Sequence, residues 1–172
     1  MKKPRAGEQR LPFPETERWP EPHILLSLHP EYPQAMLRGI KKYEYRRGQF
    51  IATAASAFVY ATIAKSPADR GLPTASLLAI ARLGEPILGV EVAMSIREGQ
   101  EPGSRPKMEA WLAGYTQAST HPVLDIQALP DPISLNEIRD HFPTFHPPQK
   151  YLVLANNPPL LNFLKTRSGL FE

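Results

Sequence analysis

Cysteine is absent from this chain of 172 residues. Its absence excludes disulfide bonds, a thiolate nucleophile and the cysteine-ligated zinc sites common in small domains. The glycine-rich loops that cradle nucleoside triphosphates or dinucleotides are also missing, which argues against nucleotide hydrolysis and against a redox cofactor. We therefore expect no cofactor.

The histidines lack the spacing of a metal site. None stands four residues from another, as two ligands on one helical face would, and none has a cysteine companion. We expect no metal centre, although His29, at the end of a predicted strand, could line the same cleft as the basic motif described below. The five histidines are His23, His29, His121, His141 and His146.

Long apolar runs are missing as well. No stretch approaches the roughly 20 apolar residues that span a membrane as a helix. Residues 1–10 contain no apolar core of the kind that a secretory signal needs. The sequence therefore predicts no membrane partner and a cytoplasmic location.

Proline, in contrast, is abundant, with 20 residues. Because the apolar content stays ordinary at 42%, the prolines indicate short elements separated by turns and not a disordered chain. Five of them fall within residues 1–22, which we expect to form an extended or disordered arm whose end Trp19 could pin to the domain. Residues 23–172 are then one domain that includes a C-terminal helix.

Positive charge is concentrated in one place. Five of the 20 cationic side chains lie between Arg38 and Arg47. Such density favours a polyanion as partner, although a solvated surface is the commoner origin of a run of charges. Tyr43 and Tyr45 within the run would stack on bases if exposed, or fill the core if buried.

The local pattern places these cations where the backbone changes direction. Residues 24–28 form a short apolar strand, and a helix of about two turns that begins near Pro30 ends at Gly39. Residues 41–47 then alternate as a strand. Strict alternation would put Lys41 on the tyrosine face, so we expect Lys41 to lie in the turn before the strand.

The rest of the chain predicts short strands and short helices in irregular order. Residues 57–64 and 87–97 have the composition or alternation of strands, and residues 74–83 suit either a capped helix or an apolar strand, of which we favour the helix. A small mixed β-barrel decorated with short helices, in the α+β class, fits this order best. Other expected elements are a helix from Pro106, a strand over 123–129, a helix capped by Ser134, a strand over 151–155 and a helix capped by Asn157.

The basic run fits the pattern Gly-x-Lys-x-x-Glu-x-Arg, with Gly39, Lys41, Glu44 and Arg46 at the four fixed positions. Together with the strand and helix before it, this pattern resembles the ASCH (activating signal cointegrator homology) family, most specifically over residues 23–63. The resemblance implies a PUA-like β-barrel and an association with RNA.

From the charge and the resemblance together we expect an RNA- or nucleotide-binding domain. In a cleft, Glu44 and Arg46 would recognise one edge of a base through an acceptor and a donor held together, whereas on the surface they would form only a weak ion pair. The residues expected to bind nucleic acid are Arg38, Lys41, Lys42, Glu44, Arg46 and Arg47.

A hydrolase acting on RNA or modified nucleosides is the alternative, with Lys41 and Glu44 as candidate catalytic residues. Some members of the family resemble amidohydrolases of N-acylated cytidine, in which the motif lysine lies beside a threonine nucleophile, but Glu44 takes the place of that threonine here. Others resemble ribonucleases, in which the lysine would stabilise charge on the scissile phosphate. A third possibility is a protein-interaction module built from the proline-rich arm and the final helix, with partners that the sequence does not identify.

Overall fold

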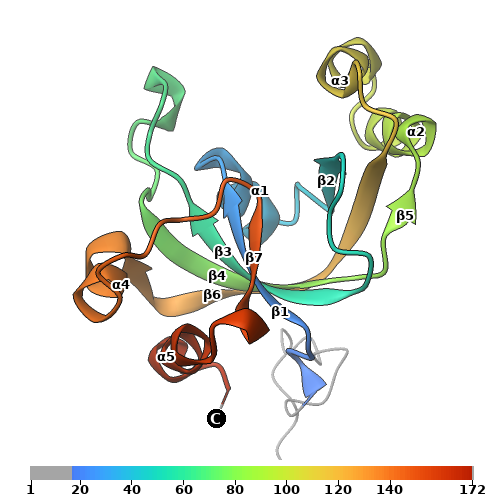
Figure 1. Cartoon of the computed structure of the whole chain (residues 1–172). Helices are drawn as coiled ribbons and strands as arrows, with labels where there is room; N and C mark the ends of the chain where they lie inside the picture. Colours follow the sequence, from blue (N-terminus) through green and yellow to red (C-terminus); the bar gives the residue numbers. More distant parts are fainter. Residues whose placement is uncertain (1–16, 172) are drawn as a thin grey trace, which may run out of the picture.

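The computed structural model describes residues 17–171 and shows a strongly curled sheet with short helices around it (Figure 1). The sheet is mixed and forms a half-barrel, so the predicted α+β class with a barrel-like sheet is confirmed. The strands are β1 (His23–Leu28), β2 (Tyr43–Arg47), β3 (Ala55–Ala61), β4 (Ser76–Leu83), β5 (Ile87–Leu88), β6 (Ala118–Ser134) and β7 (Tyr151–Val153). The α-helices are α1 (Glu31–Leu37), α2 (Val90–Gln100), α3 (Arg105–Leu112), α4 (Leu135–His141) and α5 (Pro158–Ser168), with 3-10 turns η2 (Pro67–Asp69) and η3 (Leu154–Asn156).

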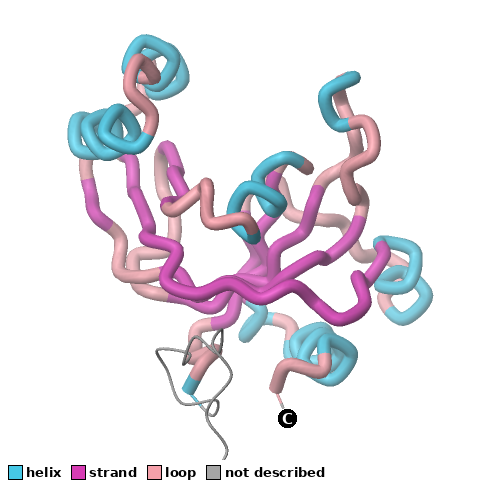
Figure 2. Tube along the Cα trace, turned by 180° about the vertical axis from the view of Figure 1, so that it is seen from behind, coloured by secondary structure: helices cyan, strands magenta, loops and turns pink. Residues whose placement is uncertain are grey.

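The long strand β6 organises the sheet, because its two halves pair with different neighbours. Its first residues pair with β2 and with β5, and its later residues pair with β4. From β4 the order continues through β3 and β1 to β7, with β1 and β3 parallel and the other pairs antiparallel. The curl of β6 brings β2 to the concave side of the sheet, where α1 also lies (Figures 1 and 2).

The central strands are buried on both faces. On the convex side, Phe58 and Ile80 belong to an apolar layer that α4 and α5 cover. On the concave side, Val59 packs in a second layer with Met36 of α1. A third, smaller cluster joins α2 and α3 to the start of β6. Because α5 covers the convex layer, the C-terminal end of the described chain lies on the side opposite α1 (Figures 1 and 2).

Several local predictions are confirmed. The first helix ends just before Gly39, which adopts a φ of 71°. Ser134 caps α4, because its Oγ accepts from the backbone N–H of Glu137 at 3.1 Å, and Asn157 caps α5 through the N–H of Leu160 at 3.3 Å.

The prediction of a strand over residues 87–97 is wrong. Only Ile87 and Leu88 pair as a strand, and α2 begins directly after Gly89. Gly89 still donates its N–H to Ala118 of the ladder while its carbonyl accepts from Ala93, the first hydrogen bond of the helix. The backbone therefore changes from strand to helix within one residue, at a φ of 123° that side-chain-bearing residues rarely adopt.

The preference for a helix over residues 74–83 is also wrong, because this segment contains the strand β4. Residues 77–81 are all buried, since β4 lies between β3 and β6 and both of its faces are covered. A strand covered on both faces loses the alternation of polar and apolar residues that distinguishes a strand from a helix in a sequence.

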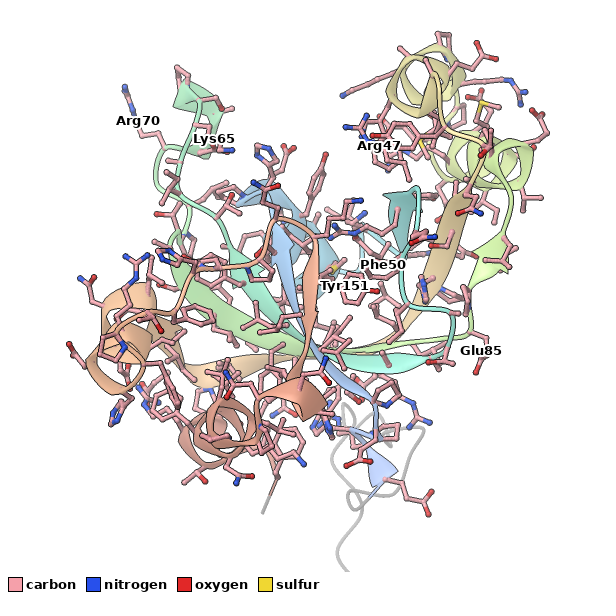
Figure 3. The ribbon with its side chains drawn as sticks, viewed as in Figure 1. Arg47, Phe50, Lys65, Arg70, Glu85 and Tyr151 are labelled. Carbon is pink, nitrogen blue, oxygen red and sulfur yellow. The ribbon has the colours of Figure 1, made fainter. Side chains whose placement is uncertain are left out.

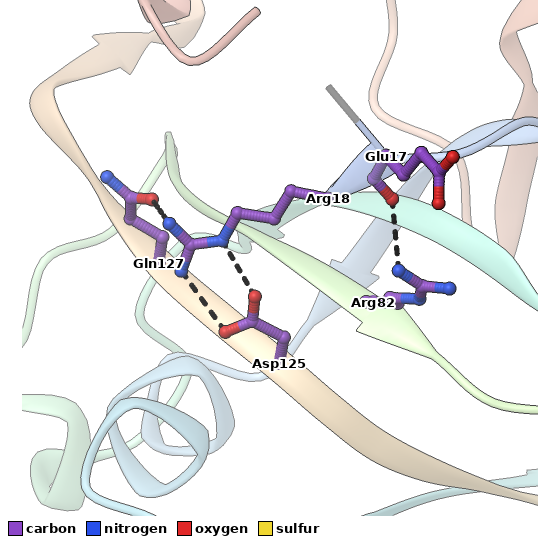
Figure 4. Close-up of polar contacts among 5 residues, drawn as sticks. All are labelled: Glu17, Arg18, Arg82, Asp125 and Gln127. Carbon is purple, nitrogen blue, oxygen red and sulfur yellow. Dashed lines mark hydrogen bonds and ion pairs between the residues drawn. The ribbon is translucent and has the colours of Figure 1, made fainter. Parts of the chain in front are cut away.

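The residues just before β1 pack on the sheet. Trp19 is buried in the convex layer, as predicted, and Arg18 forms an ion pair with Asp125 of β6 at 2.7 Å while also donating to Gln127 (Figure 4). The carbonyl of Glu17 accepts from the Arg82 side chain (Figure 4). Most of the arm predicted over residues 1–22 lies outside the described residues, so its extended or disordered state stays a prediction.

Candidate nucleic-acid interface

The basic motif starts where α1 ends. The backbone N–H groups of Ile40 and Lys41 both donate to the carbonyl of Ala35, at 2.9 and 3.0 Å. With Gly39 in the left-handed region, these bonds close the helix and turn the chain toward β2. Lys41 therefore precedes the strand, as the sequence predicts.

Lys41, Glu44 and Arg46 meet in space. Nζ of Lys41 lies 3.3 Å from Oε2 of Glu44, and Nε of Arg46 donates to Oε1 of Glu44 at 2.8 Å. The three side chains are only 10%, 4% and 15% exposed, so the surrounding protein holds them in place. We call this cluster the basic triad, because two cations against one carboxylate leave it one net positive charge.

Aromatic rings fix the two cations of the basic triad. Nζ of Lys41 lies 5.0 Å from the ring centre of Tyr32 and 5.1 Å from that of Tyr45, while the guanidinium of Arg46 lies 5.3 Å from the ring of Phe50. Burial raises the pKa of the Tyr45 hydroxyl, which therefore stays protonated at neutral pH. Contacts with ring faces orient a cation without using its N–H donors.

The basic triad also connects opposite sides of the half-barrel. Nη2 of Arg46 donates to the carbonyl of Ser27 in β1 at 3.3 Å. Phe50, which follows β2, packs edge-on against Tyr151 of β7 with 4.6 Å between the ring centres (Figure 3). These contacts tie the motif strand to β1 and β7, so the basic triad lies inside the curl of the sheet.

Two buried polar atoms on this face of the sheet, Ser119 Oγ and His121 Nε2, have no hydrogen-bond partner within residues 17–171. Ser119 and His121 lie opposite Arg46 and Glu44 in the β2–β6 ladder and therefore share their face. Buried polar atoms in folded proteins are nearly always paired, so such a cluster marks a place that water or a ligand completes. Oε2 of Glu44, in contrast, has Nζ of Lys41 as its partner at 3.3 Å.

His121 presents a basic nitrogen at this place. Its Nδ1 lies 2.9 Å from the carbonyl of Gly84, an acceptor, so Nδ1 carries the proton and Nε2 is left with a lone pair. Burial lowers the pKa of His121 below its ordinary value, and the ring is therefore neutral near pH 7. Its edge contact with Phe50, at 5.2 Å between ring centres, holds it in this orientation.

The other three predicted binding residues lie outside the basic triad. Arg38, Lys42 and Arg47 are all exposed. Nε of Arg38 donates to the carbonyl of Gln34 at 3.3 Å, and Nη1 of Arg47 donates to the carbonyl of Trp111 at 2.8 Å. The structure thus brings three of the six residues together and leaves three on the surrounding surface.

Sequence reasoning missed Arg97. Its guanidinium lies 5.7 Å from the ring of Tyr45 and pairs with Glu101, the residue that directly follows α2. Because this segment is a helix and not the expected strand, its helical face places a cation next to Tyr45. His29, which we expected near the motif, lies edge-on to Tyr32 with 6.3 Å between the ring centres, next to the aromatic partner of Lys41.

Neither a metal-ligand cluster nor a membrane-spanning helix is found in the described part of the chain. Across residues 17–171, no three or more His, Asp or Glu side chains are grouped so that they would hold a metal ion. Over the same range, no helix has the length and apolar character needed to cross a membrane. Two open surface hollows, of about 530 Å³ along α5 and about 320 Å³ beside His23, contain no residue of the motif.

Comparison with known proteins finds similar solved structures. No protein-family model matches the chain, and no curated protein matches it. The crystal structure of a serine-to-alanine mutant of the ASCH protein from Zymomonas mobilis is similar over 86% of this chain and 99% of that chain, with a TM-score of 0.67 and 26% identity. The crystal structure of ASCH from the same organism is similar over 83% of this chain and 94% of that chain, with a TM-score of 0.63 and 28% identity. The crystal structure of a tyrosine-to-phenylalanine mutant of that protein is similar over 85% of this chain and 98% of that chain, with a TM-score of 0.66 and 24% identity.

Proposed function

The chain carries an ASCH domain with a PUA-like fold, and from this premise we propose that it binds RNA or nucleotides through the basic triad of Lys41, Glu44 and Arg46. One observation carries the proposal: the basic triad has a net positive charge and shares its face with two buried polar atoms, of Ser119 and His121, that residues 17–171 leave unpaired. A purely structural ion cluster would be expected to satisfy its own hydrogen bonds.

The chemistry of the basic triad suits a base or a ribose better than a phosphate. Phosphate oxygens only accept hydrogen bonds, whereas the unprotonated Nε2 of His121 needs a donor. The amino groups of bases and the 2′-hydroxyl of ribose supply such donors, and Lys41 and Arg46 can donate to the carbonyl oxygens of the same ligand. The exposed cations that remain for the phosphates of a longer strand are Arg38, Lys42 and Arg47.

Titration of RNA binding against salt tests the proposal. Binding that depends on phosphate contacts weakens steeply as salt rises, because each contact releases condensed counterions. Lys41→Gln and Arg46→Gln should each weaken binding by about tenfold or more, the usual scale for a lost hydrogen bond to a charged group. Arg105→Gln is the matched control, since it removes an exposed cation that pairs with Glu91 away from the basic triad.

Circular dichroism should show that each variant keeps the fold. Affinity that hardly changes with salt, or that survives both Lys41→Gln and Arg46→Gln, would remove the proposed mechanism. An equal loss in Arg105→Gln would show that total charge, and not the basic triad, determines binding.

The position of His121 favours one second candidate, a hydrolase. A neutral imidazole with an unprotonated Nε2, on the same face as Glu44, is suited to act as a general base near Lys41. Short RNAs and N-acylated nucleosides should then be turned over by the wild type, and turnover should fall with both Lys41→Ala and His121→Gln. Turnover that persists unchanged in both variants would exclude these residues as the catalytic groups.

A further inference from the structure

Arg47 is held differently from the other exposed cations of the motif. Its guanidinium carbon lies 4.9 Å from the ring centre of Tyr115 and 5.4 Å from that of Trp111, in addition to its hydrogen bond with the Trp111 carbonyl. An arginine has five N–H donors, and this bond uses one of them. The side chain is therefore largely ordered before any ligand arrives, which lowers the entropic cost of binding.

Tyr115 gives this arginine an accessible aromatic neighbour. The residue is 40% exposed, although the turn after β2 fixes the position of its ring. A Cβ added to Gly48, whose φ is 71°, would stand 3.5 Å from Cε1 of Tyr115, so the ring lies directly against the glycine. The N–H of Gly48 donates to Gln117 at 2.8 Å and that of Tyr115 to Leu112 at 3.0 Å, which fixes both partners of this contact.

Arg47 and the basic triad both lie along β2. Arg46 and Arg47 are consecutive strand residues, so their side chains leave opposite faces of β2. Among the described strands, β2 pairs with β6 alone, and its other edge carries no strand. Figure 3 shows Arg47 close to the α2 and α3 pair, whereas Phe50 lies toward the centre of the concave side. A polymer that crosses the open edge of β2 can contact both Arg47 and the basic triad.

We propose that Arg47, Tyr115 and Trp111 form a second subsite, which binds a phosphate and stacks the base of the nucleotide next to the one at the basic triad. Arginine fixed on aromatic rings suits the phosphate, and an exposed tyrosine suits an unpaired base of any identity. The ligand is then a single RNA strand and neither a free nucleotide nor a duplex, whose bases are already stacked on each other. This inference rests on the proposed function and specifies the ligand of the same interface.

The test compares three probes by fluorescence anisotropy or calorimetry: a single-stranded RNA of about ten nucleotides, the same RNA annealed to its complement, and free 5′-mononucleotides. Arg47→Gln should weaken binding of the single strand by about tenfold and reduce the slope of affinity against salt by about one phosphate contact. Tyr115→Leu should weaken it by about fivefold at an unchanged salt slope, because stacking involves no counterion release. Both variants should bind mononucleotides as the wild type does.

Two further variants make these results specific. Lys107→Gln removes an exposed cation from α3, which also carries Trp111, and should leave single-strand affinity within about twofold of the wild type. Arg47→Lys keeps the charge but lacks the planar guanidinium, so its affinity should fall between those of the wild type and Arg47→Gln.

Unchanged single-strand affinity in Arg47→Gln, an equal loss for strand and mononucleotide, or duplex binding as tight as single-strand binding would overturn the second subsite. None of these results would affect the basic triad. If Lys41→Gln and Arg46→Gln bind all probes as tightly as the wild type, the proposed function itself fails, and the two ideas are thereby distinguished.

Discussion

Glu44 shows how one residue determines the electrostatics of the basic triad. It is 3% exposed and contacts two cations whose side chains are also mostly buried. Exposed ion pairs contribute little to stability, because water and salt screen them. In a buried cluster, however, removing the carboxylate leaves two like charges close together with no counterion, and this is costly.

We therefore expect Glu44→Gln to lower the free energy of unfolding by about 2–4 kcal/mol, as measured by urea denaturation. The matched control is Glu101→Gln, which breaks the ion pair with Arg97 on the surface of α2 and should cost less than about 0.5 kcal/mol. Similar costs for the two variants would mean that the basic triad behaves as a solvated ion pair.

The meeting of Lys41 with Glu44 could be predicted from the sequence because it needs only local geometry. A helix that ends at Gly39 and a turn before the strand are sufficient to bring the two side chains together. The position of His121 beside Glu44 could not be predicted in this way, since it depends on the register between β2 and β6, which are neighbours in the sheet but lie far apart in the sequence. The role of these residues in binding stays a prediction.

Among the elements, α2 shows why a pattern of alternation can mislead. Leu88, Val90 and Val92 alternate with polar residues or glycine, as in a strand, but Val90, Ala93 and Met94 also satisfy the spacing of a helix. In the structure the residues with helical spacing form the buried face, because Ala93 and Met94 pack against α3 and the start of β6. What decides between the two is Gly89, whose backbone conformation ends the strand after two residues.

Substitutions at the two glycines of this segment test that explanation. Gly89→Ala should lower the free energy of unfolding by about 1–3 kcal/mol, because alanine is strained at a φ of 123°. Gly99→Ala is the matched control within α2, where no atom lies within 4 Å of an added Cβ, and it should be neutral or stabilise by up to about 1 kcal/mol. Equal effects of the two in thermal or urea unfolding would contradict a special role for Gly89.

For the whole molecule, two buried histidines couple stability to pH. His23 is 4% exposed beneath Phe171, and His121 is fully buried near the basic triad. Burial lowers the pKa of both below the ordinary value of 6.5. The unfolded chain therefore binds protons at a pH where the folded protein does not, and stability must fall as the pH drops below about 6.5.

We expect the free energy of unfolding of the wild type to be clearly lower at about pH 5 than at about pH 7.5. This difference between the two pH values should be smaller in His23→Gln and in His121→Gln, and smallest in the double variant. Urea denaturation at the two pH values measures this difference. Hydrogen bonds from backbone N–H groups lower the pKa of Asp69 and Glu98, so their contribution is lost only in more acidic solution. A pH dependence that is the same in the wild type and the double variant would show that other groups cause it.

The location of α5 has a practical consequence for measurements. The helix ends the described chain on the convex side, whereas α1 and β2 lie on the concave side (Figures 1 and 2). A protein tethered to a sensor chip through its C-terminal end would therefore present Lys41 and Arg47 to the flowing solution. Kinetics of RNA capture recorded in that orientation should match those of the untethered protein, without steric blocking by the support.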